Sequence, residues 1–310
     1  MSAADRFKDA GQIAPRLALW KYGWTMFKTH PLLGVGWGEF PRYQYDFVRT
    51  LGGVEIANNS HDIFLDLLGK TGLIGIAIVL LGLLTWLVRV VRAPHTAARV
   101  FGIALIGVLV MHALVEYPQQ YMFFLLPAMF VFGLLETRSL RLLPSRVSFG
   151  VYALIVFGGL AGLYPICRDY NRAEVLYYGA RPAEQYSEDP SFLFRAWGEY
   201  GMATLLPMNA MDMDHKLAMH KQALALLPGE TVLRRYAVLQ ALSGDSDAAF
   251  DTVARLKIFA EELHDWPSQQ GYLYELCDEQ KSLAGFKAEL VKRYGTPPKD
   301  VNQDDDDNDS

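Results

Sequence analysis

The chain has 310 residues, of which 51% are hydrophobic, and its mean hydropathy is +0.10. A soluble protein of this length rarely has a positive mean, so membrane-spanning segments are expected in the apolar first half. The net charge of −5 comes largely from the acidic tail "DDDDNDS", and the sequence has no basic stripe, which argues against nucleic-acid binding.

Residues 13–29 are predicted to form an amphipathic helix that ends before Pro31. Its apolar residues at helical spacing are Leu17, Trp20, Trp24 and Phe27. Tryptophans on such a face suit the lipid headgroup zone, so we expect the helix to lie flat on the membrane. Arg16 lies on this helix. Its guanidinium is suited to bind two oxygens of a diphosphate, although a headgroup contact explains it equally well.

The segment "PLLGVGWGEF" has three glycines at alternate positions, Gly34, Gly36 and Gly38. Glycine reaches positive φ and lets the backbone approach a ligand or another chain closely. The spacing differs from the dinucleotide-binding fingerprint. Gly34 and Gly36 are therefore candidate substrate-binding residues, with a turn packed by neighbouring aromatic residues as the alternative.

The stretch "NNSHDIFLDLLGKTGLIG", residues 58–75, passes from a polar loop into a membrane helix, with His61 at the boundary. A histidine held there can be neutral near pH 7 and accept a proton, which makes His61 a candidate general base. A plain cap or interfacial residue is the alternative. Asp62 follows it directly, and the glycines that permit close packing of the helix are Gly69, Gly72 and Gly75.

Four apolar runs approach the roughly 20 residues that cross a bilayer. They are Leu73–Val91, Phe101–Val115, Tyr121–Leu135 and Val147–Ile166. We therefore predict about four membrane spans, the second and third joined as a hairpin. Two short loops between spans are basic and are expected to be cytoplasmic. Their arginines are Arg89, Arg92 and Arg99 in the first loop, and Arg138, Arg141 and Arg146 in the second.

The stretch "MHALVEYPQQY" closes the second span. His112 and Glu116 are four residues apart, so on a helix they would share one face and could hydrogen-bond. Ionisable residues at membrane depth favour a functional role, whereas solvated side chains at the outer surface are the alternative. Tyr117 adds a hydroxyl group beside them.

Residues beyond the last span have a soluble, helical composition. The stretch from His220 to Leu263 predicts three helices separated by turns, with Ala237 and Ala241 inside, and is similar to one or two tetratricopeptide-type units. Such units bind peptides or neighbouring domains, or serve as a structural cap. Cys167 and Cys277 are far apart in the sequence and are expected to be free, buried thiols, with a single disulfide between them as the alternative. The metal and nucleophile motifs CxxC, HExxH and GxSxG do not occur, so neither a metal nor a cofactor is predicted.

Three stretches together resemble the O-antigen ligase/polymerase superfamily. They are "THPLLGVGWGEF", "NNSHDIFLDLLGKTGLIG" and "HALVEYPQQYMFFLLPAMFVFGLLE". The family signature is a histidine, then Asn, Ser or Gln, nine residues and Gly-x-x-Gly. Here His61 and the spacing to Gly72 match, whereas Asp62 replaces the usual amide or hydroxyl. The "HxLxEYP" stretch and the helical C-terminal region are most similar to the PglL-type O-oligosaccharyltransferases, which act on pilins and other proteins.

The resemblance implies a glycosyltransferase of the bacterial inner membrane. It would take a glycan from an undecaprenyl-diphosphate carrier and pass it to Ser or Thr hydroxyls of pilin-like or other periplasmic proteins. His61 would be the general base and Arg16 would hold the departing diphosphate. Asp62, His112, Glu116, Tyr117, Gly34 and Gly36 would bind or orient the substrates. An O-antigen ligase or polymerase acting on a sugar acceptor is the alternative enzyme, and a non-catalytic membrane-anchored scaffold is the alternative from another class.

The expected fold is all-α, with polytopic membrane helices followed by a soluble tetratricopeptide-like domain. The expected regions are a periplasmic loop with the interfacial helix (1–60), a transmembrane domain (61–166), a periplasmic helical domain (167–296) and a disordered acidic tail (297–310). The resemblance also implies that longer family members have further membrane helices ahead of residue 1.

Overall fold

In the computed structural model every regular element of the described residues is a helix, and those residues contain no strand. The described residues are 13–136, 144–179, 187 and 189–297. The predicted all-α class is therefore confirmed for this part of the chain. The predicted acidic tail beyond residue 297, together with Arg138 and Arg141, lies outside the described residues.

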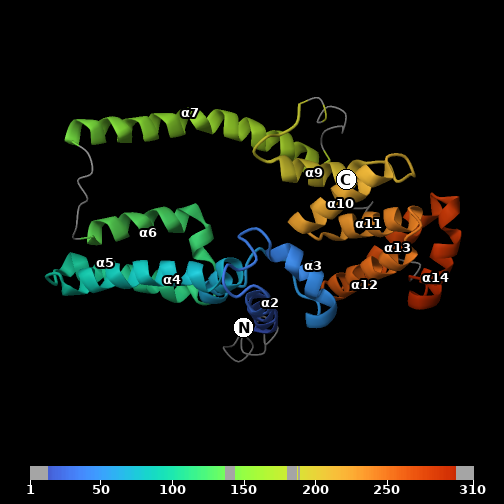
Figure 1. Ribbon diagram of the computed structural model, residues 1–310, viewed down its shortest axis with the longest axis horizontal. Helices are drawn as coiled ribbons and strands as arrows, with labels where there is room; N and C mark the ends of the chain where they lie inside the picture. The colour runs from blue at the N-terminus through green and yellow to red at the C-terminus, as the bar shows by residue number, and fades with distance from the viewer. Residues whose placement is uncertain (1–12, 137–143, 180–186, 188, 298–310) are drawn as a thin grey trace, which may run out of the picture. The chain divides into compact units, whose positions relative to one another are not determined.

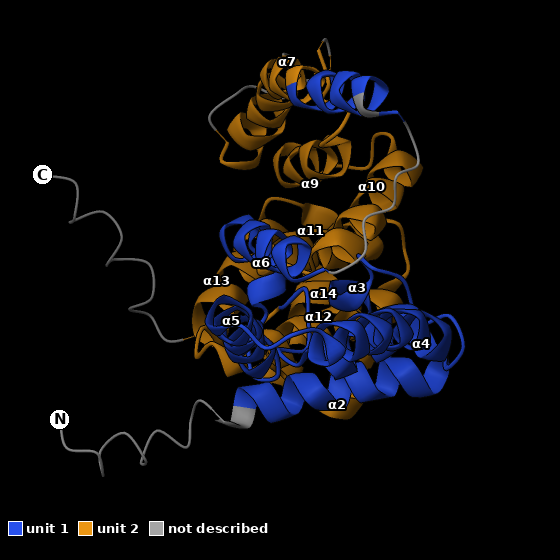
Figure 2. Cartoon of the chain, turned by 90° about the vertical axis from the view of Figure 1, so that its left-hand side faces the viewer, with its two compact units in different colours: residues 1–43, 57–156 blue, residues 44–56, 157–310 orange. Residues whose placement is uncertain are grey.

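The chain divides into two compact units, each made of two stretches of sequence (Figure 2). Unit 1 combines Met1–Tyr43 with Ala57–Val156, and unit 2 combines Gln44–Ile56 with Phe157–Ser310. The helix α3 (Phe40–Leu51) contributes to both units, so the segment 44–56 belongs with the C-terminal helices. The four regions expected from the sequence remain predictions.

Unit 1 contains the apolar helices. They are α2 (Ile13–Thr29), α4 (Ile63–Arg92), α5 (Ala97–Ala113), the short 3-10 helix η2 (Pro118–Gln120) and α6 (Met122–Leu135). The end of α6 meets the ends of its neighbours, because Glu136 accepts two hydrogen bonds from Arg89 of α4, at 2.7 and 3.2 Å. Arg99 of α5 donates to the carbonyl of Leu135 at 3.2 Å. α5 and α6 therefore form the predicted hairpin beside α4 (Figure 1).

Two helices are long and apolar enough to cross a membrane, α4 and α7 (Ser145–Tyr177). α5 and α6 are apolar but have only 17 and 14 residues. Most large apolar side chains of these helices are exposed, as expected of surfaces that face lipid rather than water. α4 and α7 are thus candidate spans by length and composition, and the predicted total of about four remains a prediction.

The helix α2 begins and ends where the sequence predicted. It packs on α4 through Leu19, Tyr22 and Met26, which are buried, and leaves Leu17 and Trp24 exposed. Trp20 is only partly exposed and its Nε1 is buried, so only part of the tryptophan-bearing face is open, and the flat orientation on the membrane stays a prediction.

The helix α4 is broken at Gly72, whose φ of 65° and ψ of −166° lie in a region essentially restricted to glycine. The loop that follows α2 supplies hydrogen bonds to the backbone around the break. The bonds run from Leu73 N to Pro31 O (2.8 Å), from Ile74 N to Leu32 O (3.1 Å), from Val35 N to Gly69 O (2.9 Å) and from Gly36 N to Lys70 O (3.0 Å). Backbone groups freed inside an apolar helix are thereby satisfied within the chain, as a membrane environment demands.

Gly34 and Gly36 have positive φ values of 69° and 113° in this loop. A Cβ on Gly34 would lie 2.3 Å from the backbone of Lys70, so glycine is required for the loop to dock. The close approach expected of these glycines is thus made to α4 of the same chain. A role of Gly34 and Gly36 in substrate binding stays a prediction.

Unit 2 is a bundle of short helices with its own core. They are α9 (Arg195–Leu205), α10 (Met213–Leu226), α11 (Glu230–Leu242), α12 (Ser246–Glu262), α13 (Trp266–Asp278), the 3-10 helix η3 (Lys281–Leu283) and α14 (Ala284–Tyr294). The three helices predicted after the last span are found as α10, α11 and α12. Gly244 makes the turn at a φ of 92°, and Asp245 caps α12 by accepting from the amide of Ala248 at 3.0 Å. The likeness to tetratricopeptide units remains a prediction.

Both cysteines are free, as predicted, but only Cys277 is buried. Burial raises the pKa of the Cys277 thiol to about 12, so it is an inert core residue. Cys167 is exposed on α7, so the expectation that it is buried was wrong. The reason is that α7 has few neighbours, and its side chains face outward along the apolar stretch.

His220 is buried in α10, where its Nδ1 lies 2.8 Å from the carbonyl oxygen of Lys216. Burial disfavours the charged imidazolium and lowers the pKa of His220 from 6.5 to about 4. The unfolded chain binds a proton at His220 more readily than the folded chain, so protonation favours unfolding. The stability that depends on a neutral His220 is therefore fully present above the unfolded pKa of this histidine. It is lost as the pH falls through 6.5 towards 4.

Unit 2 should therefore lose about 2 kcal/mol of stability between pH 7 and pH 5 through His220 alone. Urea unfolding of His220→Leu, followed by circular dichroism at both pH values, should show a smaller loss than wild type. The exposed His215 provides the matched control, and His215→Leu should keep the wild-type pH dependence. An unchanged pH dependence in His220→Leu would contradict the assignment.

Gly72→Ala should destabilise the chain by more than about 2 kcal/mol, since alanine disfavours this conformation and its Cβ would lie 2.4 Å from the Leu32 backbone. Gly82→Ala, in the same helix, is the control because a Cβ there meets nothing within 4 Å. That change should be neutral or slightly stabilising. Thermal unfolding in detergent measures both, and equal melting temperatures would exclude a structural need for glycine at the break.

Candidate functional site

His61 lies in the loop immediately before α4. Its φ of 56° is unusual for a residue with a side chain, and Asn59 stabilises it by accepting the His61 amide through Oδ1 at 3.0 Å. Asp62 then begins α4, with its carboxylate accepting from the amide of Leu65 at 2.8 Å. Asn59 and Asp62 therefore fix the backbone on both sides of His61, from which the imidazole projects.

Glu116 is the centre of the site. One carboxylate oxygen lies 3.1 Å from Nδ1 of His61, and the other accepts a hydrogen bond from the guanidinium of Arg16. The side chains of Arg16, Glu116 and His61 are 37%, 31% and 22% exposed, so an incoming group can reach all three. The structure thus brings together three residues that are separated by up to 100 positions in the sequence.

The contact with Glu116 determines the chemistry that His61 can perform. A carboxylate accepts the Nδ1 proton and thereby leaves Nε2 as the basic nitrogen, the arrangement that orients a catalytic histidine. Tyr117 holds the ring from the side, with centroids 4.5 Å apart at 80°. Tyr121 stacks on Tyr117 at 5.5 Å, so the imidazole is braced by an aromatic pair.

His112 is placed differently from the sequence prediction. The helix α5 ends at Ala113, so Glu116 lies beyond the regular helix and the two side chains do not share a face. The ring of His112 packs edge-on against Phe124, 5.7 Å away, while only its backbone carbonyl accepts the amide of Glu116 at 3.0 Å. The predicted side-chain hydrogen bond was therefore wrong. A role for His112 in substrate binding stays a prediction.

Sequence reasoning missed a buried ion pair behind the site. Lys70 donates to Asp66 at 2.9 Å, and the two residues are 3% and 4% exposed. The second oxygen of Asp66 accepts the amide of Ser60 at 3.2 Å, and Lys70 lies 5.1 Å from the ring centroid of Trp37. The pair therefore fixes the residue that precedes His61. An acid and a base four residues apart at the start of an apolar helix were the available signal.

The described residues contain no group of His, Cys, Asp or Glu side chains that could hold a metal ion. The site itself presents an imidazole, a carboxylate and a guanidinium. Asp62 uses one oxygen to cap α4, so its proposed contact with substrate stays a prediction.

Two family models match the chain. Residues 100–271, more than half of the chain, match the family described as "Virulence factor membrane-bound polymerase, C-terminal". Residues 1–80 match the family described as "O-Antigen ligase". Arg16 and His61 come from the second match and Glu116 from the first, so the site combines both matched segments.

Two curated relatives are both from Acinetobacter baylyi. A general O-oligosaccharyltransferase is 26% identical over 160 residues, which is 52% of this chain and 28% of that protein. A ComP-specific O-oligosaccharyltransferase is 29% identical over 137 residues, which is 43% of this chain and 24% of that protein. The chain thus spans about a quarter of the length of these relatives. No solved structure matches it.

The buried pair gives a direct test of how the site is supported. Asp66→Asn removes one charge while keeping an oxygen for the Ser60 amide. It should cost about 3 kcal/mol because Lys70 is left buried and unpaired. The double variant Asp66→Asn/Lys70→Met removes both charges and should regain most of that loss. Melting temperatures in detergent compare them, and a double variant as unstable as the single one would argue against the pair.

Proposed function

The chain belongs to the O-antigen ligase/polymerase superfamily, and we propose that it forms the catalytic part of a membrane glycosyltransferase. In this proposal a glycan leaves an undecaprenyl-diphosphate carrier and joins a Ser or Thr hydroxyl of a pilin-like or other periplasmic protein. The names of the two relatives, both O-oligosaccharyltransferases, support a protein acceptor.

The observation that carries the proposal is the single carboxylate shared by a histidine and an arginine. Nε2 of His61 takes the proton of the acceptor hydroxyl, whose oxygen forms a bond to the anomeric carbon. The bond from that carbon to the diphosphate oxygen breaks, and the carrier leaves with the electron pair as an anion. Arg16 uses one donor for Glu116, and its remaining donors are suited to the departing diphosphate.

The position of the site along α4 suits this chemistry. His61 stands two residues before the first residue of α4, whereas the Arg89–Glu136 pair marks the other end, roughly 40 Å away along the helix axis. The reacting groups are therefore at one boundary of the apolar layer. A lipid carrier places its diphosphate at that same boundary, because its chain stays in the membrane and its sugar projects into water.

The orientation in the membrane follows from the basic end. Arg89 and Arg92 in the last turn of α4, and Arg99 in α5, favour a cytoplasmic location for that end. The site and unit 2 then lie in the periplasm, and the chain is a multi-pass protein of the bacterial inner membrane.

A sugar acceptor is the alternative supported by a specific observation, the match of residues 1–80 to the O-antigen ligase family. The base and the diphosphate site would be the same, and only the attacking hydroxyl would differ. A non-catalytic scaffold would need neither the general base nor the diphosphate site. Binding of a lipid-linked glycan therefore separates a scaffold from the oligosaccharyltransferase and from the ligase.

His61→Ala should abolish glycan transfer while leaving the amount of membrane-inserted protein unchanged. The chain is expressed alone and beside the remaining helices of a relative, in cells that supply a lipid-linked glycan and a pilin-like acceptor. A gel shift of the acceptor reports transfer. His215→Ala, an exposed histidine in unit 2, is the matched control and should transfer normally. Full transfer by His61→Ala would remove His61 from the mechanism, and glycosylation of lipid A–core sugar instead of the pilin would favour the ligase.

The orientation is tested with an introduced thiol, because Cys277 is buried and would not react. In a Cys167→Ser/Cys277→Ser background, a cysteine placed at the exposed Asp247 should be labelled by an impermeant maleimide in intact spheroplasts. Labelling that requires cell lysis would reverse the orientation.

A further inference from the structure

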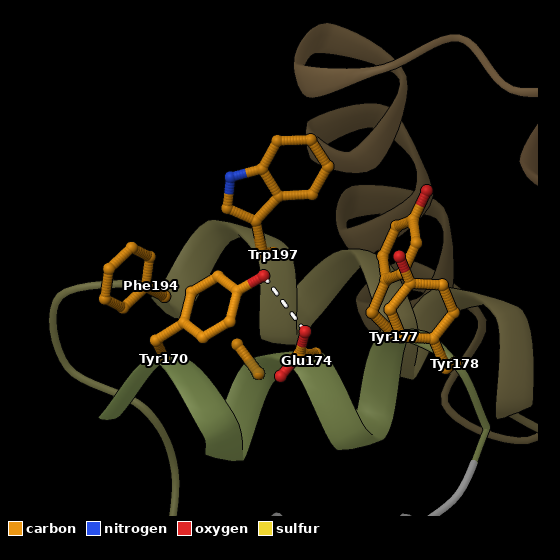
Figure 3. Close-up of a pocket in the computed structure, with 7 residues that line it drawn as sticks. Tyr170, Glu174, Tyr177, Tyr178, Phe194 and Trp197 are labelled. Carbon is orange, nitrogen blue, oxygen red and sulfur yellow. Dashed lines mark hydrogen bonds between the residues drawn. The ribbon is translucent and has the colours of Figure 1, made fainter. Parts of the chain in front are cut away.

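Unit 2 contains a cavity of about 400 Å³ between the last turns of α7 and the beginning of α9 (Figure 3). The residues that line it include Tyr170, Glu174, Tyr177, Tyr178, Phe194 and Trp197. Five of these six side chains are aromatic, and only one carries a charge. A mostly aromatic lining with a single charged group is typical of a small-molecule site, and none of these residues belongs to the Glu116 site.

The aromatic rings are packed edge to face, so they form walls rather than a stack. Tyr170 and Phe194 have centroids 5.3 Å apart at 84°, and Tyr177 and Trp197 are 5.7 Å apart at 75°. Tyr178 is 75% exposed and leaves the cavity open on one side. Perpendicular packing turns ring faces as well as ring edges towards a common space, and ring faces attract cations.

The carboxylate of Glu174 lies at the base of these rings, and the hydroxyl of Tyr170 donates to it at 3.1 Å (Figure 3). Among the described residues no cation pairs with Glu174. The neighbouring Arg172 is committed elsewhere, to Asp189 at 2.6 Å and to Asp169 at 3.5 Å. A negative charge and several aromatic rings thus line the same cavity, and no cation of the described residues pairs with that charge.

We propose that this cavity binds an alkylammonium group, and that its source is the headgroup of a zwitterionic lipid. A carboxylate together with several aromatic faces stabilises an ammonium ion through charge pairing and cation–π attraction. Aromatic residues gather at membrane surfaces in any case, but a surface belt needs no carboxylate. The carboxylate of Glu174, which has no paired cation among the residues that the structure describes, therefore distinguishes this cavity from an ordinary aromatic belt.

The position on α7 favours a lipid over a soluble amine. The apolar run of α7 ends at Ile166, and Tyr170 lies one turn further, about 6 Å along the helix axis. That distance corresponds to the headgroup layer. A phosphatidylcholine or phosphatidylethanolamine headgroup would reach the cavity without leaving the bilayer. The proposal does not depend on glycan transfer.

The test uses the full chain in lipid nanodiscs and saturation-transfer NMR with choline as the probe. In nanodiscs of phosphatidylglycerol alone, choline should bind, and its neutral isostere 3,3-dimethyl-1-butanol should not. Glu174→Gln should weaken choline at least about tenfold, the effect of losing one favourable charge interaction of this size. Glu199→Gln is the matched control, because that carboxylate pairs with Arg195 and does not line the cavity.

Each outcome decides a part of the proposal. Equal binding of choline and its isostere, or unchanged binding in Glu174→Gln, would overturn an ammonium site and leave only an apolar cleft. In nanodiscs of phosphatidylcholine, lipid headgroups should occupy the cavity and suppress the choline signal. Undiminished choline binding there would overturn the lipid as the source and favour a soluble amine. Melting temperatures equal to wild type establish that the variants are folded.

Discussion

A break inside an apolar helix must be compensated by hydrogen bonds from the same chain, and this constraint organises unit 1. The turn at Gly72 frees amides and carbonyls where no water is expected, and the loop after α2 supplies their partners. The loop can do so only because Gly34 has no side chain. Docking of this loop also holds α2 against the first turns of α4.

The same arrangement explains how one carboxylate can serve two partners. Glu116 comes from the hairpin between α5 and α6, Arg16 from α2, and His61 from the residue before Asp62, which caps α4. Each of these elements is fixed by packing or by hydrogen bonds that do not involve the site itself. A carboxylate in this position orients the histidine and restrains the arginine, and both remain partly exposed. If the proposed function holds, such pre-organisation lowers the cost of assembling the groups that take part in the transfer.

Local sequence patterns predicted the helices of unit 1 and the candidate site residues. Predictions from the sequence were wrong where a feature depends on contacts between distant segments. The bounds of α2 and the role of Pro31 followed from helical spacing and backbone restriction. The pairing of His112 with Glu116 failed because α5 ends at Ala113, and helix ends are set by tertiary packing. Arg16, His61 and Glu116 were each selected as candidates by residue type. The contact of Arg16 and His61 with the carboxylate of Glu116 could not be predicted from sequence patterns, because it depends on how the loops fold.

The proposed transfer requires His61 and Glu116 to act as one unit, and a double-mutant cycle on the transfer rate tests this most directly. Single-turnover transfer is measured for His61→Gln, Glu116→Gln and the double variant. Residues that act as a unit give losses that do not add, so the rate loss of the double variant should be clearly smaller than the product of the two single losses. Losses that multiply, or a wild-type rate in Glu116→Gln, would contradict the account.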